Sequence, residues 1–451
     1  MMKKRYAWMS ALLIGTMMLG GCGKPAAPEG GQTTAAQTEK SEAAASEAGA
    51  SDKSEKKEIT IWYEGGDARL PFFQAVEAEM QKDSPNYSIN AVTFDNSTFM
   101  TKVLQATAAT GGVDLVFNDA SRILEIDQQT DHGFMDLTDV LEANPNKDLV
   151  TDGDKLLSSV NGALAVMPVN RTIAGLGVKT DVQGVEVNEE TLPSDWEKFT
   201  ALGEAYKKAG IPGFTMHLGA DPGQAFNLFM CGSGMQDVFL NGTPESQVGK
   251  NKEYFTKIIS VYAGENGFWD KDAPSEDFAA MYNKIQSGSV GMFRVGNWNA
   301  GNWDKADSGV GEYTVTTFPG MNGTEGGLVL LNTRGFAIPK NSENVDAAKV
   351  YLSYVLNKDP QTKSFETMGS CMDNSVVDTG ALSKNQKIFF DGNVKVYPID
   401  NYVAEFSYYN AIKDAYEKGI INAFNSKSED EISANVDQLD ESLTKVIGDN
   451  K

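Results

Sequence analysis

The amino-acid sequence predicts an α/β protein with two lobes, each a mostly parallel β-sheet flanked by helices. Two observations carry this prediction. Residues 58–117 alternate strand, helix, strand, helix, strand, a pattern typical of a parallel sheet with right-handed crossovers. In addition, 451 residues are too many for one ordinary hydrophobic core, so two lobes or domains are expected.

Local patterns place the first three strands and the helices between them. β-Branched and aromatic residues mark the strands, and apolar residues at helical spacing mark the helices. Asp67 is expected to cap the first helix, and Pro71 to lie in its first turn. The expected strands are 58–63, 87–94 and 113–117, and the expected helices lie between Asp67 and Ser84 and at 99–110.

Polar residues stand where two of these strands end. In open parallel sheets, ligands bind beyond the carboxyl ends of the strands. The candidate ligand contacts at these ends are Tyr63, Glu64, Gly65, Asn118 and Asp119. For Glu64 and Asp119, a solvated turn or a helix cap is the alternative.

Strands and helices continue to alternate toward the C-terminus. A helix at 196–208 is expected to be capped by Ser194 or Asp195. The later strands are expected at 164–168, 214–217, 290–295, 313–318 and 328–338, and the later helices at 225–230, 254–263, 278–285 and 346–356. The last helix should bury the apolar stripe Ile432, Val436, Leu439, Leu443 and Val446.

Two tryptophans follow the strand expected at 290–295, set among asparagines and glycines. An indole in a loop is costly to expose unless something covers it. With amides beside it, a flat ring suits a ligand that has an apolar face and a polar rim, such as a sugar. We therefore expect Asn297 and Trp298 to contact ligand, and packing of Trp298 and Trp303 in the core is the alternative.

One arginine lies within the strand expected at 328–338. Arg334 is unusual there unless its side chain reaches a pocket or a partner charge. It is therefore a candidate ligand contact, and a salt bridge to Glu64 or Asp119 is the alternative.

The N-terminus predicts export and lipidation. Basic residues at 3–5 precede an apolar run at 7–19, and Leu19-Gly20-Gly21-Cys22 resembles the lipobox of bacterial lipoproteins. This resemblance implies a signal peptide at 1–21 and an acylated Cys22 that anchors the protein outside the cytoplasm, on the cell membrane, through lipid alone. An ordinary secretory signal is the alternative. Residues 22–57 have almost no large apolar side chain and are expected to form a flexible tether.

Composition argues against several partners and chemistries. The net charge of −23 argues against nucleic acid and against a polybasic membrane patch. Cys231 and Cys371 could pair in an exported protein, or each could be buried as a small hydrophobic residue. No zinc, P-loop or nucleophile-elbow motif is present, so we expect no cofactor, no metal and no enzymatic activity.

Several segments, taken in order, resemble the carbohydrate-type extracellular solute-binding proteins of bacterial ABC importers, the maltose-binding-protein-like group. They include ITIW at 59–62, FMTKVLQATAATGGVDLVFND at 99–119, NKIQSGSVGMFRVGNW at 283–298 and GFAIPKNSENVDAAKVYLSYVL at 335–356. The resemblance implies a periplasmic-binding-protein-like fold with a hinge between lobes and the ligand in the cleft. The implied first lobe is 58–172 with 318–371, and the implied second lobe is 173–317 with 372–451.

The resemblance also implies roles for single residues. Trp298 matches a tryptophan that stacks on a sugar ring. The polar or aromatic contacts implied at other positions are Glu64, Asp67, Asn118, Asp119, Asp221 and either Phe406 or Tyr408. Asn332 and Arg334 stand where many relatives are rich in glycine and tryptophan, a departure that would suit an anionic or otherwise unusual sugar.

We therefore predict a monomeric, lipid-anchored, substrate-binding subunit that captures a sugar or oligosaccharide and delivers it to the transmembrane permease of an ABC importer. One alternative is an exported glycan hydrolase that uses carboxylates such as Glu64 and Asp119. Another is a ligand sensor that hands its signal to a membrane receptor.

Overall fold

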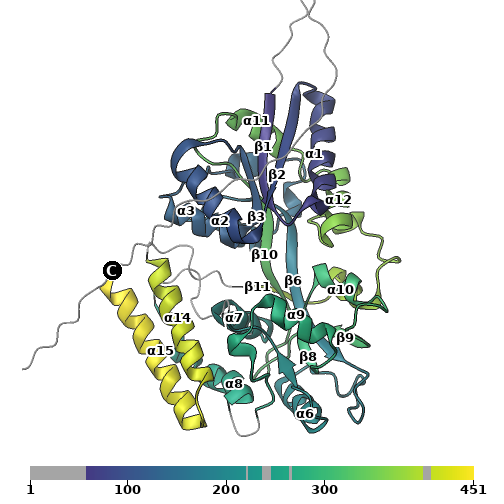
Figure 1. Ribbon diagram of the computed structural model, residues 1–451, viewed down its shortest axis with the longest axis vertical. Helices are drawn as coiled ribbons and strands as arrows, with labels where there is room; N and C mark the ends of the chain where they lie inside the picture. Colours follow the sequence, from purple (N-terminus) through teal and green to yellow (C-terminus); the bar gives the residue numbers. More distant parts are fainter. Residues whose placement is uncertain (1–56, 220–221, 236–244, 264–266, 400–407, 451) are drawn as a thin grey trace, which may run out of the picture. The chain divides into compact units, whose positions relative to one another are not determined.

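A computed structural model of the chain describes residues 57–450, except for 220–221, 236–244, 264–266 and 400–407. Within these residues, the main sheet has the strand order β2-β1-β3-β10-β6-β8-β7. Two further strands belong to the same sheet, because β11 pairs with β10 and β9 pairs with β6. Figure 1 shows β6 and β10 running next to one another between the other strands.

The strands of the main sheet are β1 (Lys57–Glu64), β2 (Tyr87–Phe94), β3 (Leu115–Asp119), β6 (Met167–Lys179), β7 (Phe214–Thr215), β8 (Met292–Gly296), β9 (Tyr313–Thr316), β10 (Leu328–Ala337) and β11 (Val396–Pro398). A separate hairpin pairs β4 (Ser159–Val160) with β5 (Ala163–Leu164). The helices are α1 (Leu70–Asp83), α2 (Asn96–Gln105), α3 (Ala120–Gln129), α4 (Thr138–Glu142), α5 (Asp152–Ser158), α6 (Trp196–Lys208), α7 (Pro222–Gly232), α8 (Lys252–Ala263), α9 (Phe278–Gln286), α10 (Asn297–Trp303), α11 (Val345–Leu352), α12 (Lys358–Met368), α13 (Lys384–Lys387), α14 (Tyr409–Phe424) and α15 (Glu429–Asp449). None of the helices described here is both long and apolar enough to cross a membrane.

The predicted parallel sheet is confirmed at the start of the fold. β1 pairs in parallel with β2 on one side and with β3 on the other. α1 buries Phe72, Phe73, Val76 and Met80 against this sheet, as its helical spacing predicts. The expected cap is wrong, however: Asp67 begins a short 3₁₀ turn, and the residue before α1 is Arg69, whose side chain makes no capping bond.

The two largest hydrophobic cores of the described residues lie along the main sheet, and β6 and β10 pass through both. β6 packs Met167 and Val169 into the first core and residues 173–178 into the second. β10 returns antiparallel to β6, with residues 328–331 in the second core and Phe336 in the first. Along β6 the change of core falls between residues 169 and 173, and along β10 it falls inside the strand. The lobe limits at residues 172 and 318 stay a prediction.

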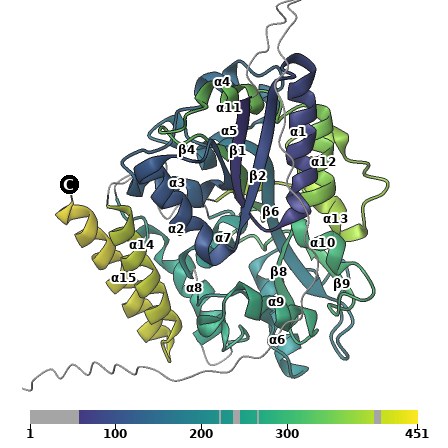
Figure 2. The same ribbon diagram turned by 45° about the horizontal axis from the view of Figure 1, so that its top comes forward.

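Three further expectations can be compared with the structure. Cys231 and Cys371 are free and buried, so the disulfide considered for them is wrong, and burial raises the pKa of the Cys371 thiol to about 12. The stretch expected to be a loop at Trp298 is the short helix α10. The C-terminal stripe is confirmed except at its end, where Ile447 is buried in place of Val446. Figures 1 and 2 show α14 and α15 side by side.

Candidate functional site

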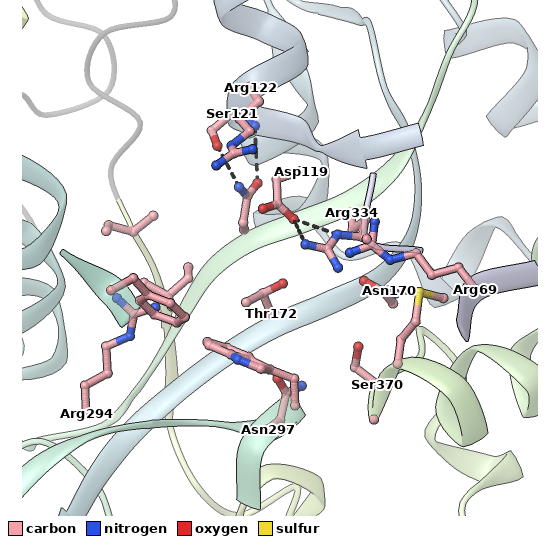
Figure 3. A pocket seen from close by; sticks show the side chains of 18 of the residues that line it. Arg69, Asp119, Ser121, Arg122, Asn170, Thr172, Arg294, Asn297, Arg334 and Ser370 are labelled. Atoms are coloured by element: carbon pink, nitrogen blue, oxygen red, sulfur yellow. Dashed lines mark hydrogen bonds and ion pairs between the residues drawn. The ribbon is translucent and has the colours of Figure 1, made fainter. Parts of the chain in front are cut away.

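A cavity of about 1090 Å³ lies at the carboxyl ends of β1 and β3, beside the middle of β6 and β10. This is the edge of a parallel sheet at which ligands bind. Its side chains come from segments far apart in the sequence, and Figure 3 shows several of them around the open space. The side chains that line it include those of Arg69, Asp119, Arg122, Asn170, Thr172, His217, Phe278, Arg294, Asn297, Trp298, Asn332, Arg334 and Ser370.

The lining is basic although the chain is acidic. Six of the described lining residues are cationic, whereas three carry a carboxylate. The whole chain has a net charge of −23. Cations are therefore concentrated at this cavity, where low-dielectric walls strengthen their field.

Arg334 and Asp119 form an ion pair on one side of the cavity. The antiparallel register of β10 and β3 places the two residues directly opposite one another. The Arg334 Nε donates to Asp119 Oδ1 at 2.8 Å, and Nη2 lies 2.7 Å from the same oxygen. The side chains keep 21% and 25% of their exposure, so both still face the cavity. The salt bridge considered for Arg334 is confirmed, and it does not remove the residue from the site.

Arg69 lies beside this pair (Figure 3). Its guanidinium donates to the carbonyl oxygen of Glu64 and lies 5.9 Å from the ring centroid of Phe117. Gly65 makes this position accessible: its φ is +94°, and a Cβ there would come within 2.7 Å of the Arg69 guanidinium. Burial, together with the positive charge of Arg334, lowers the pKa of Arg69 to about 10.

A second ion pair joins the first turn of α3 to the end of β1. Arg122, in the first turn of α3, donates to Glu64 Oε2 at 2.9 Å. Glu64 is 8% exposed and does not line the cavity. We call Arg69, Asp119, Arg122 and Arg334 the arginine wall. Glu64 does not line the cavity, so it and Asp119 do not flank a bound ligand as the two carboxylates of a glycan hydrolase would.

The opposite side, formed by Phe278, Arg294, Trp298 and His217, we call the aromatic wall. The Trp298 indole N–H donates to Tyr282 Oη at 3.0 Å, and that hydroxyl donates to Asn299. The ring also lies against Gly296, where a Cβ would come within 2.2 Å of it. Arg294 is buried, 5.2 Å from the Phe278 ring and 5.7 Å from the Trp298 ring, and supports the indole through cation–π contact.

His217 is the other polar group of the aromatic wall. It is 5% exposed, packs edge-on against Phe278, and its Nδ1 has no hydrogen-bond partner within the described residues. Burial and the nearby charge of Arg294 lower the pKa of His217 to about 4, so the imidazole is neutral at pH 7. The unpartnered Nδ1 is itself buried, so it is an unsatisfied polar atom beneath the aromatic wall.

The sequence-predicted site residues are only partly brought together. Asp119, Asn297, Trp298 and Arg334 line the cavity, as does Gly65. Asn297 uses both ends of its amide on the backbone of β6: Oδ1 accepts from Ile173 and Nδ2 donates to Arg171. It therefore ties α10 to β6 and positions Trp298. Trp303 is 4% exposed and packs in the core, as its alternative held.

Other predicted contacts lie elsewhere. Tyr63 is 1% exposed because its ring turns into the first core against Phe73. Asn118 is fully buried, since adjacent residues of a strand point to opposite faces and Asp119 takes the cavity side. Asp67 is exposed and Tyr408 half-buried, and neither lines the cavity. Asp221 and Phe406 lie outside the described residues.

Several lining residues had no sequence-based prediction. Arg294 occupies a short apolar strand, and the reasoning that singled out Arg334 applies to it equally. Asn170 and Thr172 are polar positions inside the long strand β6, and Arg69 stands four residues beyond Gly65. No local pattern marks Ser370 or His217. Within the part of the chain that is described, no cluster of His, Cys, Asp or Glu side chains is arranged to hold a metal ion.

A large cavity, beside two long strands that pass through both cores, is the arrangement of a protein that binds a small molecule. The sequence profile of the bacterial extracellular solute-binding proteins matches residues 75–390, so the chain belongs to this family, whose members are non-enzymatic receptors. No protein of curated function matches the chain in sequence.

Solved structures confirm the periplasmic-binding-protein-like fold. The cyclic α-maltosyl-1,6-maltose binding protein from Arthrobacter globiformis is 17% identical with a TM-score of 0.69, over 87% of this chain and 99% of that one. The GacH receptor of Streptomyces glaucescens, solved unliganded and with acarbose, is 18% identical with a TM-score of 0.65 over 87% and 99%. A solute-binding protein from Thermotoga lettingae, bound with α-D-tagatose, is 16% identical with a TM-score of 0.66 over 86% and 100%.

Proposed function

We propose that this protein is the lipid-anchored, substrate-binding subunit of an ABC importer and that it captures a sugar or oligosaccharide in the cavity between the arginine wall and the aromatic wall. The observation that carries the proposal is the Trp298 indole at the cavity, whose polar atom is already bonded to Tyr282. Its ring is thereby left to contact the apolar face of a sugar.

The size and mixed chemistry of the cavity support this ligand class. Ligand pockets commonly enclose roughly 300–1,000 Å³, and a cavity of about 1090 Å³ accommodates more than one sugar ring. Around Trp298, hydroxyl and amide groups from Asn170, Thr172 and Ser370 supply donors and acceptors for sugar hydroxyls. Two similar structures carry acarbose and tagatose, ligands of different size in the same fold.

The arrangement of β6 and β10 supports delivery to a permease. Both strands run from one core to the other, so a ligand that contacts both walls favours a conformation in which the two walls are close. The transmembrane subunits of the importer would recognise that conformation. The monomer is the unit that this cycle requires, because both walls come from one chain.

The anchor is part of the proposal. Leu19-Gly20-Gly21-Cys22 supports cleavage before Cys22 and acylation of its thiol. The expected result is incorporation of labelled palmitate into the membrane fraction of cells that express the wild-type chain. Cys22→Ala should abolish the label and release the protein. Retention of label in Cys22→Ala would overturn the anchor and leave the binding proposal intact.

A thermal-shift screen against mono- and oligosaccharides, with amino acids and short peptides as controls, tests the ligand class. A ligand present at 100 times its Kd adds about 2.7 kcal/mol to the free energy of unfolding, a shift that such a screen resolves. We expect a selective shift with one class of saccharide. A shift with a peptide or an amino acid alone would contradict the carbohydrate assignment and keep the binding fold.

A further inference from the structure

We propose that the saccharide is anionic and that its carboxylate, sulfate or phosphate group binds between the guanidinium groups of Arg69 and Arg334. This inference rests on the proposed function. It adds the charge of the ligand and the residues that bind the charged group.

The first observation is that, of two neighbouring guanidinium groups, one has a carboxylate partner and the other has none within the described residues. Arg334 is paired with Asp119, whereas Arg69 forms no ion pair within the described residues and donates only to the Glu64 carbonyl. Arg122 does not change this balance, because its partner Glu64 is a separate carboxylate. The Arg69–Asp119–Arg334 group therefore carries one uncompensated positive charge at the cavity surface.

The second observation is that the backbone conformation at Gly65 determines where the Arg69 guanidinium lies. Gly65 has a left-handed φ and no Cβ, and without both features the guanidinium could not lie where it does. The Glu64 carbonyl and the Phe117 ring hold it from two further directions. An arginine placed so specifically beside another cation, at partial burial, is unfavourable for the empty protein and favourable once an anion arrives.

The geometry suits an oxyanion in particular. A guanidinium presents a planar fork of N–H donors that matches a carboxylate, sulfate or phosphate. Figure 3 shows the guanidinium groups of Arg69 and Arg334 side by side, with Asp119 on the far side of Arg334. An oxyanion between them would accept from both.

The other residues that line the cavity favour an oxyanion that is part of a saccharide. Trp298 offers a ring surface, and Asn170 and Ser370 offer further polar groups in the cavity. A small inorganic anion would leave most of a cavity of about 1090 Å³ unfilled. A sugar acid places its charge at the arginine wall while its ring extends toward the aromatic wall.

Calorimetric titration with matched pairs tests the proposal. The probes are trigalacturonate and its methyl ester, glucuronate and glucose, glucose 6-phosphate and glucose, and N-acetylglucosamine 6-sulfate and N-acetylglucosamine. At least one acidic probe is expected to bind about tenfold or more tightly than its neutral partner, the effect of a charge-assisted contact. The probe pair whose two members differ in affinity identifies which oxyanion the site binds.

Variants test whether Arg69 and Arg334 cause the preference for acidic probes. Arg69→Gln and Arg334→Gln should each reduce the acidic-to-neutral preference to near unity while binding of the neutral probe changes little. Arg69→Lys, which keeps the charge but loses the planar fork, should retain part of the preference. Lys147→Gln removes one surface charge that pairs with Glu142 outside the cavity, and it should leave the preference unchanged. The melting temperature of each variant without ligand shows that it is folded.

The other possible outcomes distinguish a failure of the anionic inference from a failure of the sugar-binding function. Equal binding of acidic and neutral members of every pair would overturn the anionic inference and leave the sugar-binding function in place. An equal loss of thermal stability without ligand in both Arg→Gln variants, with the preference retained, would assign the arginine pair a purely structural role. Citrate serves as an anion that is not a saccharide: binding of citrate but of no saccharide would overturn the sugar function and keep the anion site. Binding of no probe would overturn both.

Discussion

The two walls of the cavity are held in place by different interactions. The aromatic wall is held by rings and neutral hydrogen bonds that are mostly close in sequence, from Phe278 to Trp298. The arginine wall is held by charges from the ends of β1, β3 and β10, whose positions span residues 64–334. The comparison teaches that apolar contact and charge recognition in this cavity can be changed separately.

The largest expected effect separates the two tryptophans of α10. Trp303 packs against Tyr282 and Phe293 behind the aromatic wall. Trp303→Ala should lower the free energy of unfolding by about 3–5 kcal/mol, because it leaves a large cavity in a packed core. Urea denaturation monitored by circular dichroism measures this change. A loss below about 1 kcal/mol would place Trp303 outside the core packing.

Trp298→Ala should have the complementary effect. We expect ligand affinity to fall by about 1–3 kcal/mol with the fold retained, because an aromatic at a cavity contributes contact area rather than backbone order. Calorimetric titration with the saccharide found by screening measures the change. Unchanged affinity would show that the ligand lies against the arginine wall alone.

The aromatic wall should also impart a pH dependence. The pKa of His217 is lowered to about 4 from its ordinary value of 6.5. Between these values the unfolded chain binds a proton that the folded chain does not, so stability falls as pH falls. The loss attributable to this group is about 2 kcal/mol between pH 7 and pH 5. His217→Asn should remove that part of the pH dependence in paired denaturation curves, and identical curves would show that His217 ionises in the fold.

The smallest expected effect on stability comes from Asp119→Asn, which should at the same time raise the affinity for an acidic ligand. Asp119→Asn removes the carboxylate that competes with an anionic ligand for Arg334. The free energy of unfolding should fall by about 1 kcal/mol or less, since the pair is partly exposed. Affinity for an acidic saccharide should nevertheless rise several-fold, while affinity for its neutral partner stays constant. A fall in both affinities would show that Asp119 itself binds sugar hydroxyls.

Sequence patterns predicted the fold better than the site. β2 was placed to the residue, and the stripe of α15 was placed almost completely, because both depend on local periodicity. Trp298 was found because glycines and asparagines surround it in sequence. The pairing of Arg334 with Asp119 was one of two alternatives, since the sequence does not specify the register of β10 against β3.

The local sequence did not predict the direction in which individual side chains point. Tyr63 and Asn118 belong to the correct strand ends, but their side chains point away from the cavity. The face that each residue takes is set by the strand pairing, and a shift of one residue reverses it. Arg69 was missed for a related reason: its reach over Gly65 depends on a backbone angle that no pattern of side chains reveals.

Trp298 gives the protein a built-in optical signal. Its indole N–H is bonded to Tyr282 inside the protein, while the indole lines the cavity. A bound sugar would therefore displace water around the ring without breaking that hydrogen bond, and it would change the emission of this tryptophan. Trp269 and Trp303, buried in the core, would supply a constant background. Ligand capture can thus be followed in real time, with no label, in a protein that carries its own reporter.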